Sequence, residues 1–371
     1  MILPYEDNLR IEYLSRVFDR NRVSNCYKYF WFMAILKKVQ EGQNAFSFDE
    51  LIHEMIVDAW YMVAEYNLRL GPNNTTDNLE EVVKYLYHDL YKEKVASSVP
   101  RDRLLEILEN EKDVKFTEYK KKLTNNVPYC MQTPFYDSML KNPGKDKIDL
   151  INRQERLMYY FDSYQQLKTT IVVENEWMGY FIRNREILMN WARYNLVGYL
   201  QDRNPAVPGI VDKILPPNSR KLSRVTRYWE TVIVAAPDLK DIYGDNTLSE
   251  IRVSIDHFVP WQYVAHDELW NLHPTTKSIN SSKGNHLPKF DRYFDGLVNL
   301  EYKAYQLRYS DNRVRKAFED CAAYHVNNAE VRKLLYADDL TKDDFTLRLG
   351  NVISPVYEAA KNCGFREWEY A

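Results

Sequence analysis

Residues 255–288 read IDHFVPWQYVAHDELWNLHPTTKSINSSKGNHLP, and they carry the local signals for two strands and a helix in the C-terminal part of the chain. The segment from Ser249 to Phe258 overlaps the start of this stretch. In it β-branched residues alternate with polar ones, and this period of two predicts a strand. Pro260 ends that strand, and a loop follows it. We expect residues 268–272 to form a short return strand, which Pro274 prevents from continuing.

A helix is expected directly after the two strands. Thr275 or Thr276 suits its N-cap, because a threonine side chain can accept a hydrogen bond from an early backbone N–H group. The helix then runs through Lys283 and stops at Gly284, since glycine adopts the left-handed conformation common at helix ends. The predicted local unit is therefore two strands followed by a helix.

Four polar residues follow one another through this unit: Asp256, His257, Asn271 and Asn280. This order resembles the HNH, or ββα-metal, endonucleases, and the resemblance is confined mainly to residues 250–288. By that resemblance Asp256 and Asn280 hold a metal ion. His257 is then the general base, and Asn271 orients the loop around it. The alternative is that Asp256 and His257 are an ordinary pair at the end of a strand.

The chemistry of phosphodiester hydrolysis suits these residue types. An imidazole titrates near neutrality and can deprotonate water, as His257 would. A carboxylate and a carboxamide are hard oxygen ligands, so the expected metal is Mg²⁺, with Mn²⁺ as the second choice. Neighbours on a regular strand point to opposite faces, so Asp256 and His257 can serve one site only if the strand distorts or ends there. The resemblance implies 5′-phosphate and 3′-hydroxyl products.

Three features are candidates for contacting nucleic acid. Lys283 lies one helical turn beyond Asn280 and could hold a phosphate as a point charge. His273, beside the return strand, is a second candidate, with a packing role as its alternative. The third is a basic cluster at helical spacing beside Tyr228 and Trp229, which is either a phosphate-binding face or a solvated face paired with acids. Its residues are Arg220, Arg224 and Arg227.

Composition limits the remaining classes of protein. The chain has 371 residues with 50 basic and 53 acidic side chains, so nucleic-acid binding must rest on a local patch and not on net charge. Only 11 glycines among many Leu, Glu, Lys and Arg residues favour a mostly helical fold. No apolar run approaches the ~20 residues that cross a bilayer. Four scattered cysteines indicate neither a disulfide framework nor a structural zinc, so we expect a cytoplasmic protein without membrane association.

Three segments are expected. Residues 1–203 form a helical N-terminal region, residues 204–218 a proline-rich linker, and residues 219–371 the nuclease module with flanking helices. Local signals mark several elements of this mainly α fold. They predict a capping box at residues 47–50, helix starts near residues 25, 77, 101 and 219, helical segments at 151–164 and 175–204, and a short strand at 232–236.

The function that follows is metal-dependent cleavage of DNA. By analogy with stand-alone HNH proteins that carry large accessory regions, the chain is expected to be a restriction or anti-phage defence effector. Its helical region would then sense a signal, bind a protein partner or activator, or contact nucleic acid. Two alternatives stay open: a non-catalytic adaptor that docks on DNA or protein, and a nuclease that cleaves RNA. The sequence carries no signal for oligomeric state.

Overall fold

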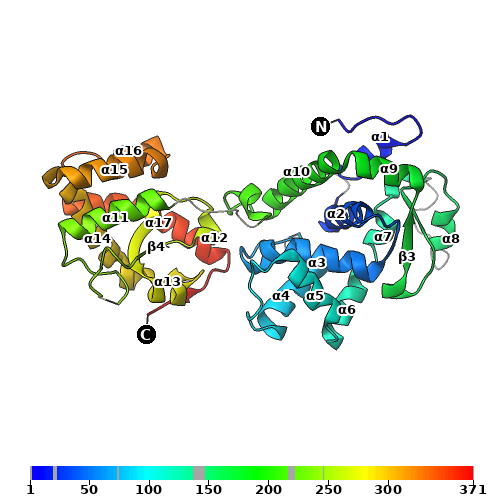
Figure 1. The fold of residues 1–371 in the computed structure, drawn as a ribbon, viewed down its shortest axis with the longest axis horizontal. Coiled ribbons are helices and arrows are strands. Elements are labelled where there is room, and N and C mark those ends of the chain that lie inside the picture. Colours follow the sequence, from blue (N-terminus) through cyan, green and yellow to red (C-terminus); the bar gives the residue numbers. More distant parts are fainter. Residues whose placement is uncertain are drawn as a thin grey trace. The chain divides into compact units, whose positions relative to one another are not determined.

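The protein is described by a computed structural model, which places residues 2–19, 23–72, 75–136, 147–215, 222–244 and 246–370. The mainly helical fold predicted from the sequence is confirmed (Figure 1). Within those ranges, no helix has both the length and the apolar character that a membrane span requires. The chain divides into two compact units: unit 1 holds residues 1–205 and 214–216, and unit 2 holds residues 206–213 and 217–371.

Unit 1 is a helical body with one small sheet. The sheet has the strand order β1-β3-β2, and both pairings are antiparallel. Its strands are β1 (Ala45–Ser47), β2 (Tyr159–Phe161) and β3 (Thr170–Val173). The α-helices are α1 (Ile11–Ser15), α2 (Tyr27–Gln40), α3 (Phe48–Ala64), α4 (Asn78–Lys84), α5 (Arg101–Asn110), α6 (Val114–Leu123), α7 (Val127–Cys130), α8 (Lys147–Asn152), α9 (Asn175–Arg183) and α10 (Arg185–Arg203). A π-helical turn, η2 (Tyr85–Leu90), extends α4, and 3-10 turns lie at η3 (Thr133–Phe135) and η6 (Gln166–Lys168).

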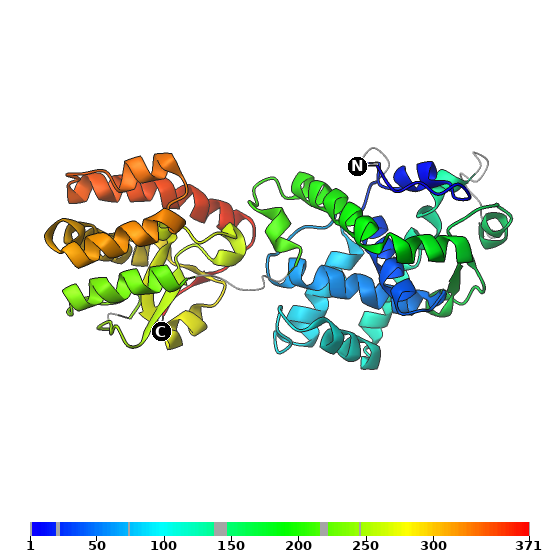
Figure 2. The ribbon, with the colours of Figure 1, turned by 45° about the horizontal axis from the view of Figure 1, so that its top comes forward.

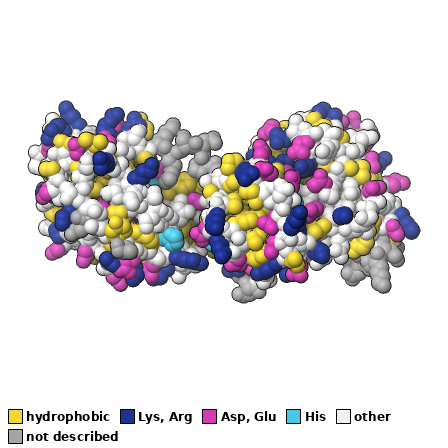
Figure 3. Space-filling model, turned by 60° about the horizontal axis from the view of Figure 1, so that its bottom comes forward, with side chains coloured by type: hydrophobic (Ala, Val, Ile, Leu, Met, Phe, Trp, Pro, Cys, Tyr) yellow, Lys and Arg dark blue, Asp and Glu magenta, His cyan; other side chains and the backbone are white. Residues whose placement is uncertain are grey.

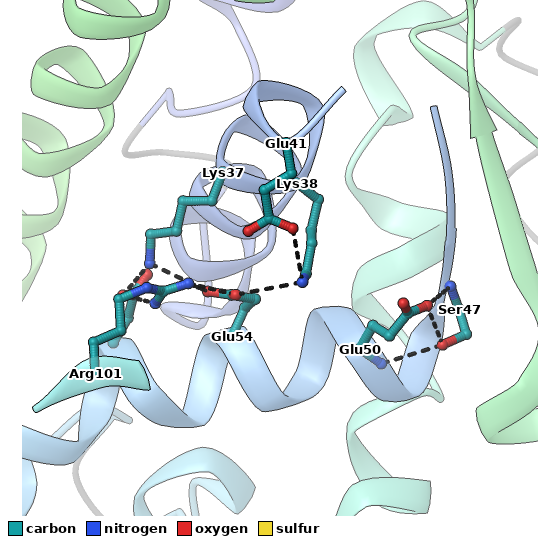
Figure 4. A network of polar contacts seen from close by, with 8 residues as sticks. Lys37, Lys38, Glu41, Ser47, Glu50, Glu54 and Arg101 are labelled. Atoms are coloured by element: carbon teal, nitrogen blue, oxygen red, sulfur yellow. Dashed lines mark hydrogen bonds and ion pairs between the residues drawn. The ribbon is translucent and has the colours of Figure 1, made fainter. Parts of the chain in front are cut away.

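The start of α3 confirms the predicted capping box. The Ser47 hydroxyl accepts from the Glu50 backbone N–H at 3.2 Å, and the Glu50 carboxylate accepts from the Ser47 N–H at 2.7 Å (Figure 4). One turn further, the buried carboxylate of Glu54 is bonded by the guanidinium of Arg101 from α5. Lys37 from α2 approaches the same carboxylate at 3.5 Å. These charges compensate one another and tie α2, α3 and α5 together inside the helical body.

Two sequence expectations in unit 1 need correction. Residues 151–164 do not form one helix, because α8 ends at Asn152 and residues 159–161 are strand β2. Tyr159 and Phe161 point to the buried side with the less buried Tyr160 between them, which is the alternation of a half-buried strand. The helical segment 175–204 is two helices, because the backbone breaks helical geometry at Asn184 between α9 and α10.

Unit 2 surrounds a two-stranded antiparallel sheet, β4 (Val253–His257) with β5 (Leu272–Thr276). Around it lie η7 (Ile210–Lys213), α11 (Ser223–Ala235), α12 (Trp261–Val264), η8 (Leu269–Asn271), α13 (Lys277–Lys283), α14 (Phe290–Ser310), α15 (Asn312–His325), α16 (Ala329–Leu335) and α17 (Lys342–Asn362). Two short strands, β6 (Leu287–Pro288) and β7 (Glu367–Trp368), pair in parallel. Helices α11 and α13 both pack on the β4–β5 pair, from opposite sides (Figures 1 and 2).

The predicted ββα unit is present, with a corrected second strand. β5 begins at Leu272 and runs through Pro274, which lies opposite Ile255, whereas the preceding residues form the 3-10 turn η8. Proline is tolerated here because each strand of a two-stranded sheet has one unpaired edge, where no backbone donor is required. The first strand is also shorter than expected, since β4 begins at Val253 and not at Ser249.

Of the remaining local expectations in unit 2, some are confirmed and others need correction. The Thr276 hydroxyl accepts from the Ile279 N–H, and Gly284 ends α13 with φ of 52°, as predicted. The loop after β4 contains the short helix α12, which was not foreseen. Residues 232–235 are the last turn of α11 and not a strand. The expected helix start at residue 219 lies outside the described residues.

Candidate active site

Asp256 lies on β4 with its carboxylate buried against three residues from other parts of the chain. The Tyr243 hydroxyl donates to its Oδ2 at 2.7 Å, and the Lys283 ammonium donates to its Oδ1 at 3.1 Å. His273, directly opposite on β5, has its Nε2 at 3.7 Å from Oδ2. Burial is the largest influence and disfavours the charged form of Asp256, but Lys283, His273 and the Tyr243 hydroxyl together outweigh it and hold the pKa of this carboxyl below its ordinary value. The carboxylate is therefore ionised at neutral pH.

His257 is the last residue of β4, so its ring faces a different environment from that of Asp256. Its Nε2 lies 2.9 Å from the Oδ1 of Asp267, in the loop that leads back to β5. The backbone of Asp267 is itself fixed, because its carbonyl lies 2.7 Å from Nδ1 of His325 on α15. Asp256 and His257 share one partner, Lys283. Its ammonium donates to the His257 carbonyl at 2.8 Å as well as to the Asp256 carboxylate. One lysine from α13 thus holds the end of the strand.

Asn271 is completely buried and braces the loop between the two strands. Its side-chain nitrogen donates to the Val259 carbonyl at 2.8 Å, and its side-chain oxygen accepts from the Val259 N–H at 2.7 Å. Its backbone carbonyl accepts from the N–H of Phe258 at 2.9 Å. These three bonds determine the path of the chain directly after His257.

Asn280 lies on α13, one turn before Lys283, and faces β4. Its side-chain nitrogen donates to the Ser254 hydroxyl and to the Ile255 carbonyl, both at 2.9 Å. Because the Ile255 carbonyl can only accept, the side-chain nitrogen of Asn280 must face it, and the side-chain oxygen of Asn280 must point away from it. Asn280 is therefore held by the strand that carries Asp256.

The residues present fit an oxygen-preferring divalent ion. Asp256 offers an ionised carboxylate, and Asn280 offers an oriented amide oxygen. Each carboxylate oxygen can accept more than one bond, so the donors from Tyr243 and Lys283 leave further acceptor positions. Among the described residues no group of three or more His, Cys, Asp and Glu could hold a metal. A carboxylate and an amide oxygen are ligands that suit a hard divalent cation better than they suit zinc.

Comparison with known families agrees with this geometry. Residues 241–289 match the family model of the HNH endonucleases. This segment is an HNH domain. The matched segment begins just before Tyr243 and contains the whole ββα unit, whereas unit 1 lies outside it. No curated protein and no solved structure gives a significant match to the chain.

Two of the predicted phosphate contacts lie inside the HNH domain. Lys283 is fully buried, with its ammonium bonded to Asp256 and to the His257 carbonyl. His273 is also fully buried, and burial lowers its pKa to about 4, so its ring is neutral at physiological pH. Its Nε2 lies 3.2 Å from the Tyr243 hydroxyl. The structure thus gives both residues internal partners, and their contacts with phosphate stay predictions.

The predicted basic cluster beside the HNH domain is only partly described. Arg227 on α11 is exposed. Arg224 lies over the Tyr324 ring at 3.7 Å from its centroid, and its Nε is 3.4 Å from Asp320 on α15. Arg220 lies outside the described residues. The pairing of Arg224 with an acid is what the alternative of a solvated face predicts. Over the face of the molecule drawn in Figure 3, basic and acidic side chains are interspersed. Nucleic-acid binding by this cluster stays a prediction.

Sequence reasoning missed two residues of the HNH domain. Asp267 could have been found, because it is a carboxylate in the loop that the resemblance placed beside His257. Tyr243 carried no comparable signal, since it precedes β4 and lies in the turn that the isolated bridge between Lys240 and Thr247 closes. Only the folded chain places its hydroxyl against Asp256.

Proposed function

We propose that this protein is an endonuclease that hydrolyses DNA phosphodiester bonds with its HNH domain and a divalent metal ion. The observation that carries the proposal is the pairing of His257 with Asp267 at the end of the strand that also presents Asp256. An imidazole oriented by a carboxylate is an arrangement that suits general-base catalysis. The match of residues 241–289 to HNH endonucleases supports the same reaction class.

In the proposed mechanism His257 takes a proton from the attacking water. The Asp267 carboxylate accepts a hydrogen bond from Nε2, which keeps the proton on that nitrogen and assigns the role of base to Nδ1. The same carboxylate stabilises the imidazolium that forms when the water is deprotonated. Asn271 holds the backbone of the loop directly after His257 through two hydrogen bonds with Val259. The expected products carry a 5′-phosphate and a 3′-hydroxyl.

Asp256 and Asn280 are the residues that would hold the metal, with Mg²⁺ preferred and Mn²⁺ as the second choice. When bound, such an ion supplies positive charge for the phosphorane and for the departing 3′ oxygen. The orientation of Asn280 by the β4 backbone and that of Asp256 by Lys283 exist before any ligand arrives. This preorganisation reduces the cost of assembling the site.

The first experiment is plasmid cleavage. Supercoiled DNA is incubated with the wild type, with His257→Ala and with His286→Ala, each in Mg²⁺, Mn²⁺ or EDTA. We expect nicking or linearisation by the wild type and by the His286→Ala control, loss of at least 10²-fold in His257→Ala, and none in EDTA. Cleavage by His257→Ala at the wild-type rate would contradict the proposal. Intact plasmid with cleaved RNA in a parallel reaction would reassign the substrate.

One observation favours a second candidate, a non-catalytic adaptor. Both oxygens of Asp256 already have donors, so the carboxylate is neutralised without a metal. An adaptor would bind DNA equally well in EDTA and leave it intact. For either function, we propose by analogy that unit 1 receives the signal or protein partner of a cytoplasmic restriction or anti-phage defence effector. Filter binding with and without EDTA separates the adaptor from the enzyme.

A further inference from the structure

We propose that Tyr243 is a positioning residue that orients the Asp256 carboxylate for the metal, and that Trp368, near the end of the described chain, holds Tyr243 in place. The inference rests on the proposed function and extends it to residues that the ββα unit does not include. Tyr243 precedes that unit, and Trp368 belongs to the strand β7.

The first step is the fixed plane of the carboxylate. Tyr243 donates to Oδ2 of Asp256 at 2.7 Å, and Lys283 donates to Oδ1 at 3.1 Å. A carboxylate rotates easily about its last side-chain bond, and two donors on its two oxygens prevent that rotation. Partners of this kind, bonded to a metal ligand and not to the metal, commonly contribute 10- to 100-fold in metal affinity.

The second step is the support of Tyr243 itself. The Asp241 carboxylate accepts from the backbone N–H groups of Tyr243 and Gly244, at 3.0 and 2.7 Å, and fixes the turn. The Tyr243 ring meets three other rings edge to face, those of His273, Trp368 and Tyr293. Its centroid lies 5.2 Å from that of Trp368 at an interplanar angle of 89°, and 5.2 Å from that of Tyr293 at 79°. The hydroxyl is thereby aimed at Asp256.

The third step places Trp368. Strand β7 pairs in parallel with β6, which follows α13, and the Lys289 N–H donates to the Trp368 carbonyl at 3.0 Å. The Tyr370 N–H donates to the Tyr293 hydroxyl at 2.8 Å, so Tyr293, a second ring against Tyr243, is bonded to the same C-terminal segment. The segment thus completes the support of a carboxylate that lies far earlier in the sequence.

The test uses the full chain and measures Mn²⁺ binding by electron paramagnetic resonance, alongside plasmid cleavage. Tyr243→Phe keeps the ring and removes only the hydroxyl, so the fold should be retained. We expect its Mn²⁺ affinity to fall on the order of tenfold. The control Tyr302→Phe, on α14, loses a hydroxyl that donates to the Leu340 backbone carbonyl, and it should bind as the wild type does. Wild-type affinity in Tyr243→Phe would overturn the role of Tyr243.

Trp368→Ala tests the support. We expect it to weaken Mn²⁺ binding in the wild type but to add little in the Tyr243→Phe background, because both changes act through one hydroxyl. An equal loss in both backgrounds would overturn the role of Trp368. Failure of the proposed function has a different signature: the wild type would then neither bind Mn²⁺ nor cleave plasmid, whatever residue stands at position 243.

Discussion

Nε2 of His257 and Oδ1 of Asp267 lie 2.9 Å apart, across the loop that joins the two strands of the HNH domain. This contact orients the proposed base and supplies the charge that stabilises its protonated form. It is formed by a loop carboxylate whose own backbone is held by His325.

Asp267→Asn should reduce catalysis and leave the fold intact. The amide keeps the size of the side chain but loses the negative charge, and it can present its NH₂ group to the ring and favour the wrong tautomer. We expect the rate of plasmid nicking to fall by about 10²-fold or more, with an unchanged melting temperature. Asp295→Asn, an exposed change on α14, is the control. An Asp267→Asn enzyme as fast as wild type would show that the pairing plays no part in proton transfer.

Asn271→Ala should destabilise unit 2. The substitution leaves the N–H and the carbonyl of Val259 buried without their side-chain partners, which costs about 2–4 kcal/mol in the free energy of unfolding. Urea denaturation followed by tryptophan fluorescence measures the loss. The exposed Asn312 on α15 provides the matched control, Asn312→Ala. A change below about 0.5 kcal/mol, the range of ordinary surface substitutions, would mean that the loop does not depend on Asn271.

Lys283→Met should destabilise the HNH domain in a manner that depends on pH. In the wild type the pKa of Asp256 is lowered from 3.8, so its stabilising contribution is present above that value and is lost as the pH falls through the folded-state pKa. In the variant, burial acts without the main opposing charge and raises the pKa of Asp256. The variant's carboxyl therefore binds a proton more readily when folded, and its stability falls as the pH rises.

The measurement for Lys283→Met is urea denaturation in EDTA at pH 5 and pH 7.5. We expect a loss of about 3–5 kcal/mol at the higher pH, the usual cost of leaving a buried charge unpaired, and a smaller loss at the lower pH. Lys277→Met, an exposed change at the start of α13, is the control. An equal loss at both pH values would contradict the assigned pairing of Lys283 with Asp256.

Arg227→Gln tests whether the face of α11 contacts DNA. If this exposed arginine neutralises one phosphate, its loss weakens binding and reduces the slope of log affinity against log salt by about 0.9. Fluorescence anisotropy with a labelled duplex at several salt concentrations measures both. Arg313→Gln is the control, because Arg313 is exposed but already paired with Asp311 at 2.7 Å. Identical slopes for wild type and Arg227→Gln would favour the alternative of a solvated face.

Several elements could be predicted from neighbouring residues because their signals are local. The capping box of Ser47 with Glu50 and the cap of Thr276 on α13 are hydrogen bonds between positions three residues apart. Such bonds depend on residue types at a short, fixed spacing and need no partner from a distant segment. The return strand was misplaced for the complementary reason. Pro274 would interrupt a central strand, which has partners on both sides. Among the residues that the structure describes, β5 pairs with β4 and with no other strand, so Pro274 lies on an edge strand, where proline is tolerated.

The order of Asp256, His257, Asn271 and Asn280 could be read along the chain, and with it the ββα unit and the resemblance to HNH endonucleases. Tertiary structure alone decided what these residues touch. It buried Lys283 against Asp256 and brought in Tyr243 and Trp368 from either side of the motif. The physical reason is that periodicity and capping report contacts within one element. Partners from distant segments are selected by the packing of whole apolar faces and by the need to pair every buried charge.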